Sequence, residues 1–359
     1  MNKMIEEVRN RLEREKSNSK RFLLSNLYIT LYDFLNDEEK NYENKFLNQI
    51  DLILSDYEFY DFLRNDAEIF RDFSLKTCDR YKKAGFNFYD LYPKNKIKFD
   101  EAKEIIFDIL NDMGLDNIDK IYDFDKIKYR NLENCEGVCI NTFGFFDGNI
   151  VLDEKISKMV VFIKALSHEI GHNYENLFMS NMSSIQQIKR YVYCFIEVCF
   201  SFFERIALDY LIKNRIYLDD ANRDLNCYYC DLYDRLSFLG DVTSKDDLED
   251  AIYDEENILC VSNNFNKETD DGENVVLYEY NYANDIKYGY GALLGEYFFD
   301  IYKKDKKEGL KSIKNFLSNQ GLLDERGMLD SINFSENDFS FFDDGLLENA
   351  KYMRKRYKW

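Results

Sequence analysis

Histidine and proline are almost absent from this chain of 359 residues. It contains two histidines and one proline, although it has 28 tyrosines and 30 phenylalanines. Because proline interrupts helices, a single copy among runs rich in Leu, Ile, Lys, Glu, Asp and Asn favours a mainly helical protein. Any site that depends on histidine must draw on the same two residues.

Positive charge and long apolar runs are also scarce. Lys and Arg number 48 against 68 Asp and Glu, which gives a net charge of −20. This balance argues against nucleic-acid binding, because contacts to phosphate need basic side chains. No run of about 18 apolar residues predicts a membrane span, and residues 1–16 lack the apolar segment of a signal peptide. We therefore expect a cytoplasmic protein.

The cysteines are consistent with that location. The chain has eight, and without a secretion signal we interpret them as mostly reduced thiols. Cys135 with Cys139, and Cys227 with Cys230, have spacings that also occur in metal sites. Whether these four bind a metal ion is left open by the sequence.

The two histidines stand four residues apart, with a glutamate directly after the first. His168, Glu169 and His172 form H-E-x-x-H, the zinc-metallopeptidase signature. On a helix, residues four apart share a face, so both imidazoles can converge on one metal ion. Glu169 can then accept the proton of a metal-bound water as general base. Apolar residues recurring over residues 156–178 predict that helix, with Asp153 as its N-cap.

A catalytic zinc ion needs a third protein ligand, which here must be Asp, Glu or Cys. The next strong helix is predicted over residues 184–214, and it contains Glu197 and Glu204 on one face. Burying an uncompensated carboxylate is costly, and a metal ion would compensate Glu197. Glu204 could orient a ligand histidine through its second ring nitrogen. Pairing of Glu204 with Arg190 or Arg205 on a solvated face is the alternative.

This pattern resembles a known family. H-E-x-G-H, a glutamate 25 residues later and another seven further on are similar to the M3 zinc oligopeptidases, the group of thimet oligopeptidase and oligoendopeptidase F. The resemblance implies one zinc ion held by His168, His172 and Glu197, with Glu169 as catalytic base and Glu204 behind the ligands. It also implies short peptide substrates. Where the family has a further histidine three residues after the motif, which is not a ligand, this chain has Glu175.

The resemblance extends upstream of the motif. Residues 137–156 are similar to the family's glycine-containing segment and to the strand before the zinc helix. Residues 149–153 also have the pattern of a short strand by themselves. In the family an edge strand beside the zinc pairs with the extended substrate. The resemblance therefore implies a substrate-binding role for Ile150, Val151 and Leu152.

Downstream, residues 278–302 resemble the family's tyrosine-rich segment, which supplies hydroxyls to the reacting carbonyl. Tyr290 matches best, and Tyr288 lies beside it. Where relatives carry a histidine that acts in the transition state, this chain has Tyr278, or Tyr280. The resemblance implies that one of these hydroxyls stabilises the oxyanion. Because tyrosine is abundant here, a role in the core is the alternative.

The expected architecture is a helical zinc-metallopeptidase fold with a small β-sheet beside the motif helix and a substrate cleft. The resemblance covers about residues 130–359. Residues 1–113 are expected to form a helical N-terminal lobe, reduced relative to longer M3 proteins, and residues 114–359 the catalytic domain. Helices in the lobe are predicted over residues 3–16, 21–36, 42–65, 67–83 and 99–113.

The favoured activity is zinc-dependent hydrolysis of internal bonds in short peptides. A related M32-like metallocarboxypeptidase is the nearest alternative. A zinc- and peptide-binding protein without turnover is another, and a helical scaffold with an accidental histidine pair is a third. The sequence leaves peptide specificity, oligomeric state and biological role open.

Overall fold

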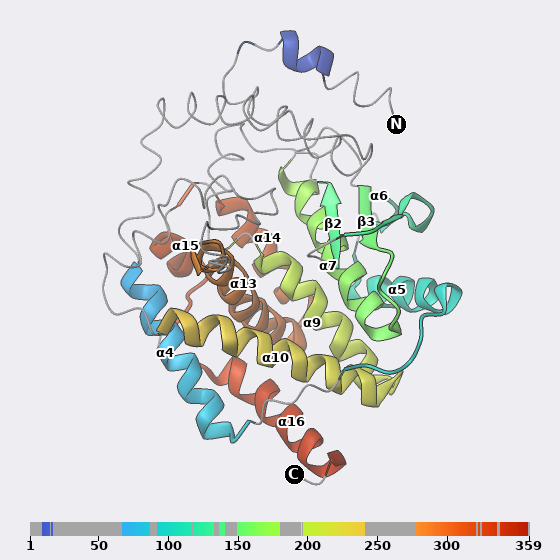
Figure 1. The fold of residues 1–359 in the computed structure, drawn as a ribbon. Helices are drawn as coiled ribbons and strands as arrows, with labels where there is room; N and C mark the ends of the chain where they lie inside the picture. The colour runs from blue at the N-terminus through green and yellow to red at the C-terminus, as the bar shows by residue number, and fades with distance from the viewer. Residues whose placement is uncertain are drawn as a thin grey trace, which may run out of the picture.

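The computed structural model of this chain describes most of its C-terminal two thirds and parts of the remainder (Figure 1). The described residues are 9–14, 16, 67–86, 92–115, 118–132, 136–140, 149–179, 195, 197–240, 278–320, 322–323, 325–335 and 338–357.

Four long helices form the centre of the fold. Helix α9 packs against both α7 and α13, and α10 crosses α9 and α13 (Figure 1). Their bounds are Met159–Met179 for α7, Val198–Lys213 for α9, Leu218–Gly240 for α10 and Tyr278–Lys304 for α13. Side chains with almost no exposure fill the space between them, including Phe162, Phe200, Phe202, Phe203 and Phe298. The aromatic residues of the sequence are thus concentrated where helices meet.

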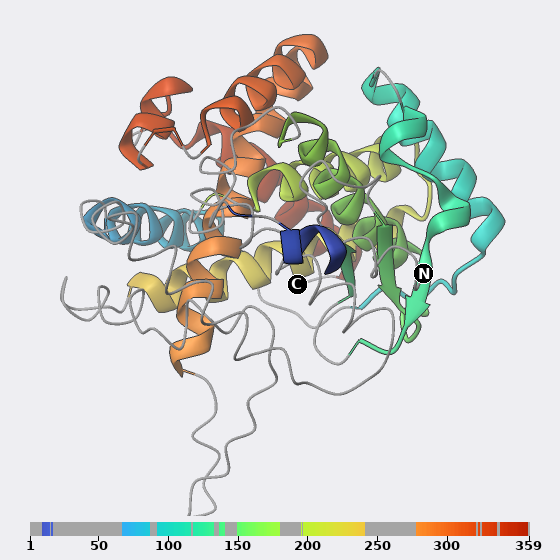
Figure 2. The same cartoon turned by 90° about the horizontal axis from the view of Figure 1, so that it is seen from above.

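Two earlier helices lie on opposite sides of this centre (Figure 2). Helix α4, Ala67–Ala84, packs on α10, and α5, Phe99–Met113, packs on α7 and α9. The predictions over 67–83 and 99–113 are confirmed, whereas those over 21–36 and 42–65 lie outside the described residues. The division into two domains at residue 113 stays a prediction, although α4 and α5 pack directly on helices of the second segment.

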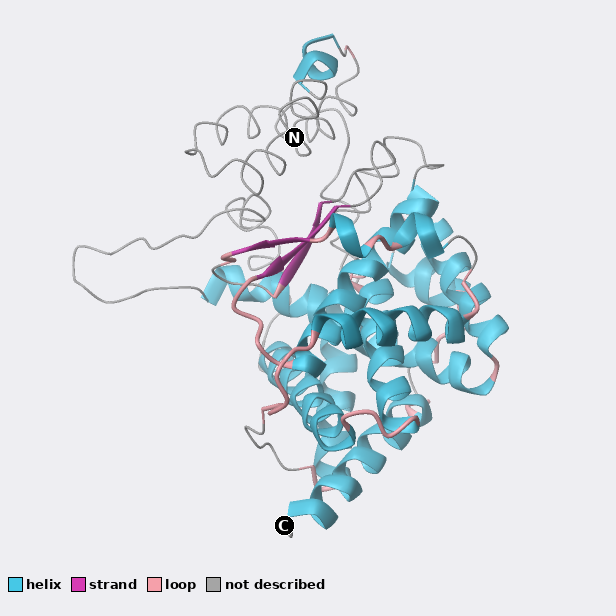
Figure 3. Ribbon diagram, turned by 90° about the vertical axis from the view of Figure 1, so that its right-hand side faces the viewer, coloured by secondary structure: helices cyan, strands magenta, loops and turns pink. Residues whose placement is uncertain are grey.

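A small sheet lies at one edge of the helical body, beside α7 (Figure 3). It contains β1, Lys128–Arg130, β2, Gly137–Ile140, and β3, Asn149–Asp153. The order is β1-β3-β2, with β1 parallel and β2 antiparallel to β3. The short helix α6, Ile118–Ile121, and the 3-10 helix η2, Phe124–Lys126, precede it. The predicted small sheet and the strand over 149–153 are confirmed.

The motif helix begins later than its sequence predicts. Asp153 is the last residue of β3, and its carboxylate accepts a hydrogen bond from the backbone N–H of Lys155 at 3.1 Å and of Leu132 at 3.3 Å. A turn separates it from Met159, where α7 starts. Asp153 is therefore not the N-cap, because the strand and its turn already use that residue.

The chain ends in three further helices on the α13 side. They are α14, Lys306–Asn319, α15, Glu325–Ser331, and α16, Ser340–Tyr357. A buried ion pair joins α9 to α13, with Arg205 Nε 2.6 Å from Glu296 Oε1. The fold is mainly α, as predicted. No helix among the described residues is both long and apolar enough to cross a membrane.

Candidate metal centre

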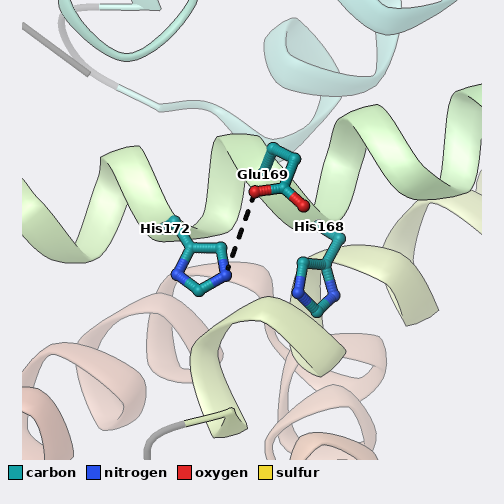
Figure 4. Close-up of side chains that lie close together, drawn as sticks. All are labelled: His168, Glu169 and His172. Carbon is teal, nitrogen blue, oxygen red and sulfur yellow. Dashed lines mark ion pairs between the residues drawn. The ribbon is translucent and has the colours of Figure 1, made fainter. Parts of the chain in front are cut away.

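Both histidines lie on one side of α7, and the carboxylate of Glu169 lies between them in Figure 4. One ligand atom from each of His168, Glu169 and His172 falls within 4.8 Å of the others. This is the one cluster of three or more His, Cys, Asp or Glu with metal-ligand spacing in the part of the chain that the structure describes. The i, i+4 geometry expected of the motif is thus present in three dimensions.

The carboxylate of Glu169 is buried beneath the sheet, with 3% of the residue exposed. It accepts a hydrogen bond from the backbone N–H of Cys139 on β2. Its other oxygen, Oε2, has no hydrogen-bond partner among the described residues and lies 4.0 Å from Nε2 of His172. A buried carboxylate oxygen without a donor is costly, so its position beside two imidazoles suits a site that binds a cation or a proton-donating water.

His168 lies between two carboxylates of the neighbouring helix. Its Nδ1 is 2.9 Å from Oε1 of Glu204, and its Nε2 is 3.6 Å from Oε2 of Glu197. If Nδ1 donates to Glu204, Nε2 carries a lone pair that faces the side of Glu197 and His172. A carboxylate on the far nitrogen is the arrangement that fixes the tautomer and orientation of metal-binding histidines.

The charges around this cluster shift the pKa values of its members. Burial alone would lower the pKa of His168, but the hydrogen bond and charge of Glu204 raise it to about 9. For Glu169, burial and the charge of Glu197 raise the pKa to about 8, against the lowering effect of His168. The pKa of Glu204 is lowered despite its burial, because His168 donates to it. His168 and Glu169 therefore keep a proton to higher pH than free side chains would, whereas Glu204 loses its proton more readily.

Glu197 reaches His168 because α9 approaches α7 very closely. An added Cβ on Gly171 would lie 2.9 Å from Cα of Phe200, so only glycine permits this spacing. On the other side, a Cβ on Gly291 of α13 would lie 2.5 Å from Cβ of Glu197. Glu197 is thus enclosed between two helices, with 2% exposure.

Glu197 does not lie inside the long helix that its sequence predicts. Helix α9 begins at Val198, directly after Glu197, and residues 180–194 and 196 lie outside the described residues. Its side chain is therefore at a helix N-terminus, where the backbone dipole favours negative charge. Glu204 lies two turns on, so both carboxylates meet the same imidazole, as their spacing predicts.

The donor set fits a zinc ion. Two imidazoles, one with its far nitrogen on a carboxylate, and a buried glutamate beside them are the groups that zinc takes in catalytic sites. The buried Oε2 of Glu169, with no donor of its own, faces the same point. We conclude that the residues present suit such a metal ion.

The predicted tyrosines have a different environment. The hydroxyl of Tyr290 lies 2.9 Å from Oγ of Ser74 on α4, and Tyr290 is 1% exposed. Tyr288 is half-buried, and its ring lies 5.0 Å from Cζ of Arg235. Tyr278 is the first residue of α13, but its side chain lies outside the described residues. Tyr290 is therefore buried against α4, and Tyr288 is the more accessible of the pair. A role of either hydroxyl at the oxyanion stays a prediction.

The strand predicted to bind substrate is not an edge strand. Val151 and Leu152 of β3 are paired on both sides, with β1 and with β2, and both have 0% exposure; Ile150 has 3%. Their backbone groups are used within the sheet. A substrate-binding role for these three residues stays a prediction. The outer strand on the side of Glu169 is β2, whose Cys139 bonds that carboxylate. Its four residues, Gly-Val-Cys-Ile, were too short to identify as a strand by pattern alone.

The structure describes three of the four cysteines with metal-like spacing. Cys227 and Cys230 lie on α10, one turn apart, and Cys139 donates to Oδ1 of Asn173 at 3.0 Å. Cys135 lies outside the described residues. Metal binding by the four cysteines stays untested.

Comparison with known proteins gives a likeness in fold. No family model and no curated protein matches the sequence. A protein described as a "putative peptidase" from Chlamydophila abortus has a similar structure, with a TM-score of 0.51 and 15% identity over 97% of this chain and 63% of that one. A "putative oligoendopeptidase F" from Bacillus anthracis gives 0.49 and 13%, over 97% and 68%.

The coverage and the sequence identity limit what this structural likeness shows. This chain spans less than two thirds of the length of the first of those proteins. At 15% identity, the likeness to it shows a shared fold.

Proposed function

We propose that this protein is a zinc-dependent oligopeptidase that hydrolyses internal bonds of short peptides. The observation that carries the proposal is the position of His168, bonded by Glu204 on one ring nitrogen and facing Glu197 with the other, beside His172 and Glu169. A chance histidine pair on a solvated helix would not need two carboxylates around one imidazole, the buried Glu197 and the largely buried Glu204. The shared fold with a protein described as a peptidase is consistent with it.

His168, His172 and Glu197 would hold the metal ion, and Glu204 would keep His168 in the tautomer that binds it. Bound zinc supplies a polarised water and a Lewis acid for the scissile carbonyl. Glu169 accepts the proton of the attacking water through Oε2, because its other oxygen is held by the N–H of Cys139. Glu169 then delivers that proton to the leaving amine.

The peptide would lie along β2. The backbone of β3 is paired on both sides, whereas β2 is an outer strand of the described sheet, and it is the outer strand that contacts Glu169, through Cys139. An extended peptide paired with an exposed strand is held by main-chain hydrogen bonds, which are independent of its sequence. We propose Tyr288 rather than Tyr290 as the hydroxyl that assists the oxyanion, because Tyr288 is half-buried whereas Tyr290 is 1% exposed.

The test is a comparison of Glu169→Gln with wild type on internally quenched peptides with blocked ends. Both proteins should contain about one zinc ion per chain, and turnover should fall by about 10³-fold in the variant, the usual loss of a general base. Glu175→Gln is the matched control, since Glu175 is another buried glutamate of α7 outside the cluster. It should keep wild-type turnover.

The outcomes separate the alternatives. Wild type purified without chelator but free of metal contradicts the proposal. Zinc in both proteins with turnover in neither favours a peptide-binding protein. Removal of single residues from free C-termini, with blocked peptides left intact, favours a metallocarboxypeptidase.

A further inference from the structure

A lysine of the motif helix lies among carboxylates from three other elements. Lys164 stands one turn before His168 on α7, and 18% of its side chain is exposed. Its Nζ is 3.5 Å from Oε2 of Glu136, the residue directly before β2, and 3.8 Å from Oδ2 of Asp224 on α10. The charge of Glu204 on α9 also acts on it. Lys164 therefore links the motif helix, the sheet and α10.

The inner part of this link is the ion pair between Lys164 and Asp224. Burial would lower the pKa of Lys164, but the charges of Asp224 and Glu136 raise it well above its usual value. Burial raises the pKa of Asp224 to about 6, against the lowering effect of Lys164. Asp224 is 3% exposed and Glu136 is half-exposed. Lys164 thus lies between a buried carboxylate, Asp224, and a half-exposed one, Glu136.

The strand β2 is attached to α7 at a second point. The backbone N–H of Cys139 bonds Glu169, and its thiol donates to Asn173 of the same helix at 3.0 Å. Glu136 and Cys139 are separated by about 10 Å of strand, and Lys164 and Glu169 by about 7.5 Å of helix. The two attachments therefore lie near the two ends of the strand, which runs along the motif helix.

We propose that Lys164 is a positioning residue that clamps the start of β2 to the motif helix and so fixes the register of this outer strand against Glu169. The inference rests on the proposed function, because the position of β2 affects activity only if a peptide binds along that strand. A peptide paired with β2 would have its scissile bond placed relative to Glu169 by the position of the strand. Lys164 touches neither the histidines nor the peptide and acts through Glu136.

The experiment compares four variants in the full-length, zinc-loaded protein. Lys164→Met removes the charge at similar length, and Lys164→Arg keeps it. Glu136→Gln breaks only the outer contact and leaves the Lys164–Asp224 pair intact, so it tests the clamp even if Lys164→Met folds poorly. Lys311→Met is the matched control, because Lys311 forms an exposed pair with Glu308 inside α14. Amide hydrogen exchange, zinc content and peptide kinetics are measured for each.

In Lys164→Met, exchange over residues 136–140 should be about tenfold faster, and in Glu136→Gln about fivefold, as expected for a partly buried and a more exposed ion pair. The KM for peptides should rise by similar factors, with kcat within about twofold and zinc content unchanged. Lys164→Arg and Lys311→Met should behave as wild type.

Unchanged exchange over β2 in both Lys164→Met and Glu136→Gln would overturn the clamp. So would equal acceleration in β2, α9 and α10, because that pattern indicates general loosening. If wild type cleaves no peptide, the proposed function fails, and the exchange pattern still decides whether Lys164 holds the strand.

Discussion

The close approach of α7 and α9 can be tested at Gly171. An added Cβ would lie 2.9 Å from Cα of Phe200 and 3.3 Å from the backbone oxygen of Cys199. Ordinary contact begins near 3.4 Å, so Gly171→Ala requires the two helices to separate by about 0.5 Å. Both obstructing atoms belong to the backbone, which cannot turn away as a side chain can.

Two opposing terms determine the effect on stability. Alanine favours a helix interior over glycine by about 1 kcal/mol. Overpacking of a well-filled contact costs about 1–3 kcal/mol. We expect Gly171→Ala to lower the free energy of unfolding by about 1 kcal/mol. Because a zinc site tolerates ligand shifts of only about 0.2 Å, the separation of Glu197 from the histidines should also weaken zinc binding about tenfold.

The assay is guanidinium denaturation together with zinc competition against a chelator. The matched control is Gly289→Ala in α13, where the nearest atom is Cδ2 of Leu236 at 3.0 Å, the mobile end of a side chain. That variant should be unchanged or more stable by up to about 1 kcal/mol. If Gly171→Ala is stabilised as much as the control and binds zinc normally, the close helix pair does not position Glu197, and the reasoning is refuted.

Two further substitutions test individual side chains. Glu204→Gln removes the negative charge that faces Nδ1 of His168. Zinc binding, measured by chelator competition, should weaken by about 10- to 100-fold, while the fold measured by circular dichroism stays the same. Wild-type affinity would contradict the orienting role of Glu204. Tyr290→Phe loses the hydrogen bond to Ser74 and should lower the free energy of unfolding by about 1 kcal/mol with kcat within about twofold. A large fall in kcat with unchanged stability would instead place that hydroxyl at the reaction.

Patterns with a strong period predicted the structure best. The histidines of α7 and the two glutamates seven residues apart met at one imidazole because helical spacing fixes which side chains share a face. The boundaries were less accurate, since Asp153 has the composition of an N-cap but belongs to the strand before the helix. Propensity identifies residues that end elements but does not decide between two neighbouring elements that can use the same residue.

The order of the strands in the sheet could not be predicted from the sequence. Residues 149–153 have the pattern of a strand, but whether a strand is central or outermost depends on β1 and β2, which are only three and four residues long. The position of Tyr290 depended in the same way on a contact with Ser74, 216 residues away. Local pattern contains no information about such partners.

The charge of the cluster is consistent with the proposed binding of a dication. Glu169, Glu197 and Glu204 surround two imidazoles, and the first two glutamates are almost fully buried. Without a metal ion, the pKa values of His168 and Glu169 rise to about 9 and about 8, so both sites hold a proton near neutral pH. Two added protons carry the same charge as one zinc ion. A dication that binds to this cluster can displace both protons. Metal binding is coupled to proton release in this way.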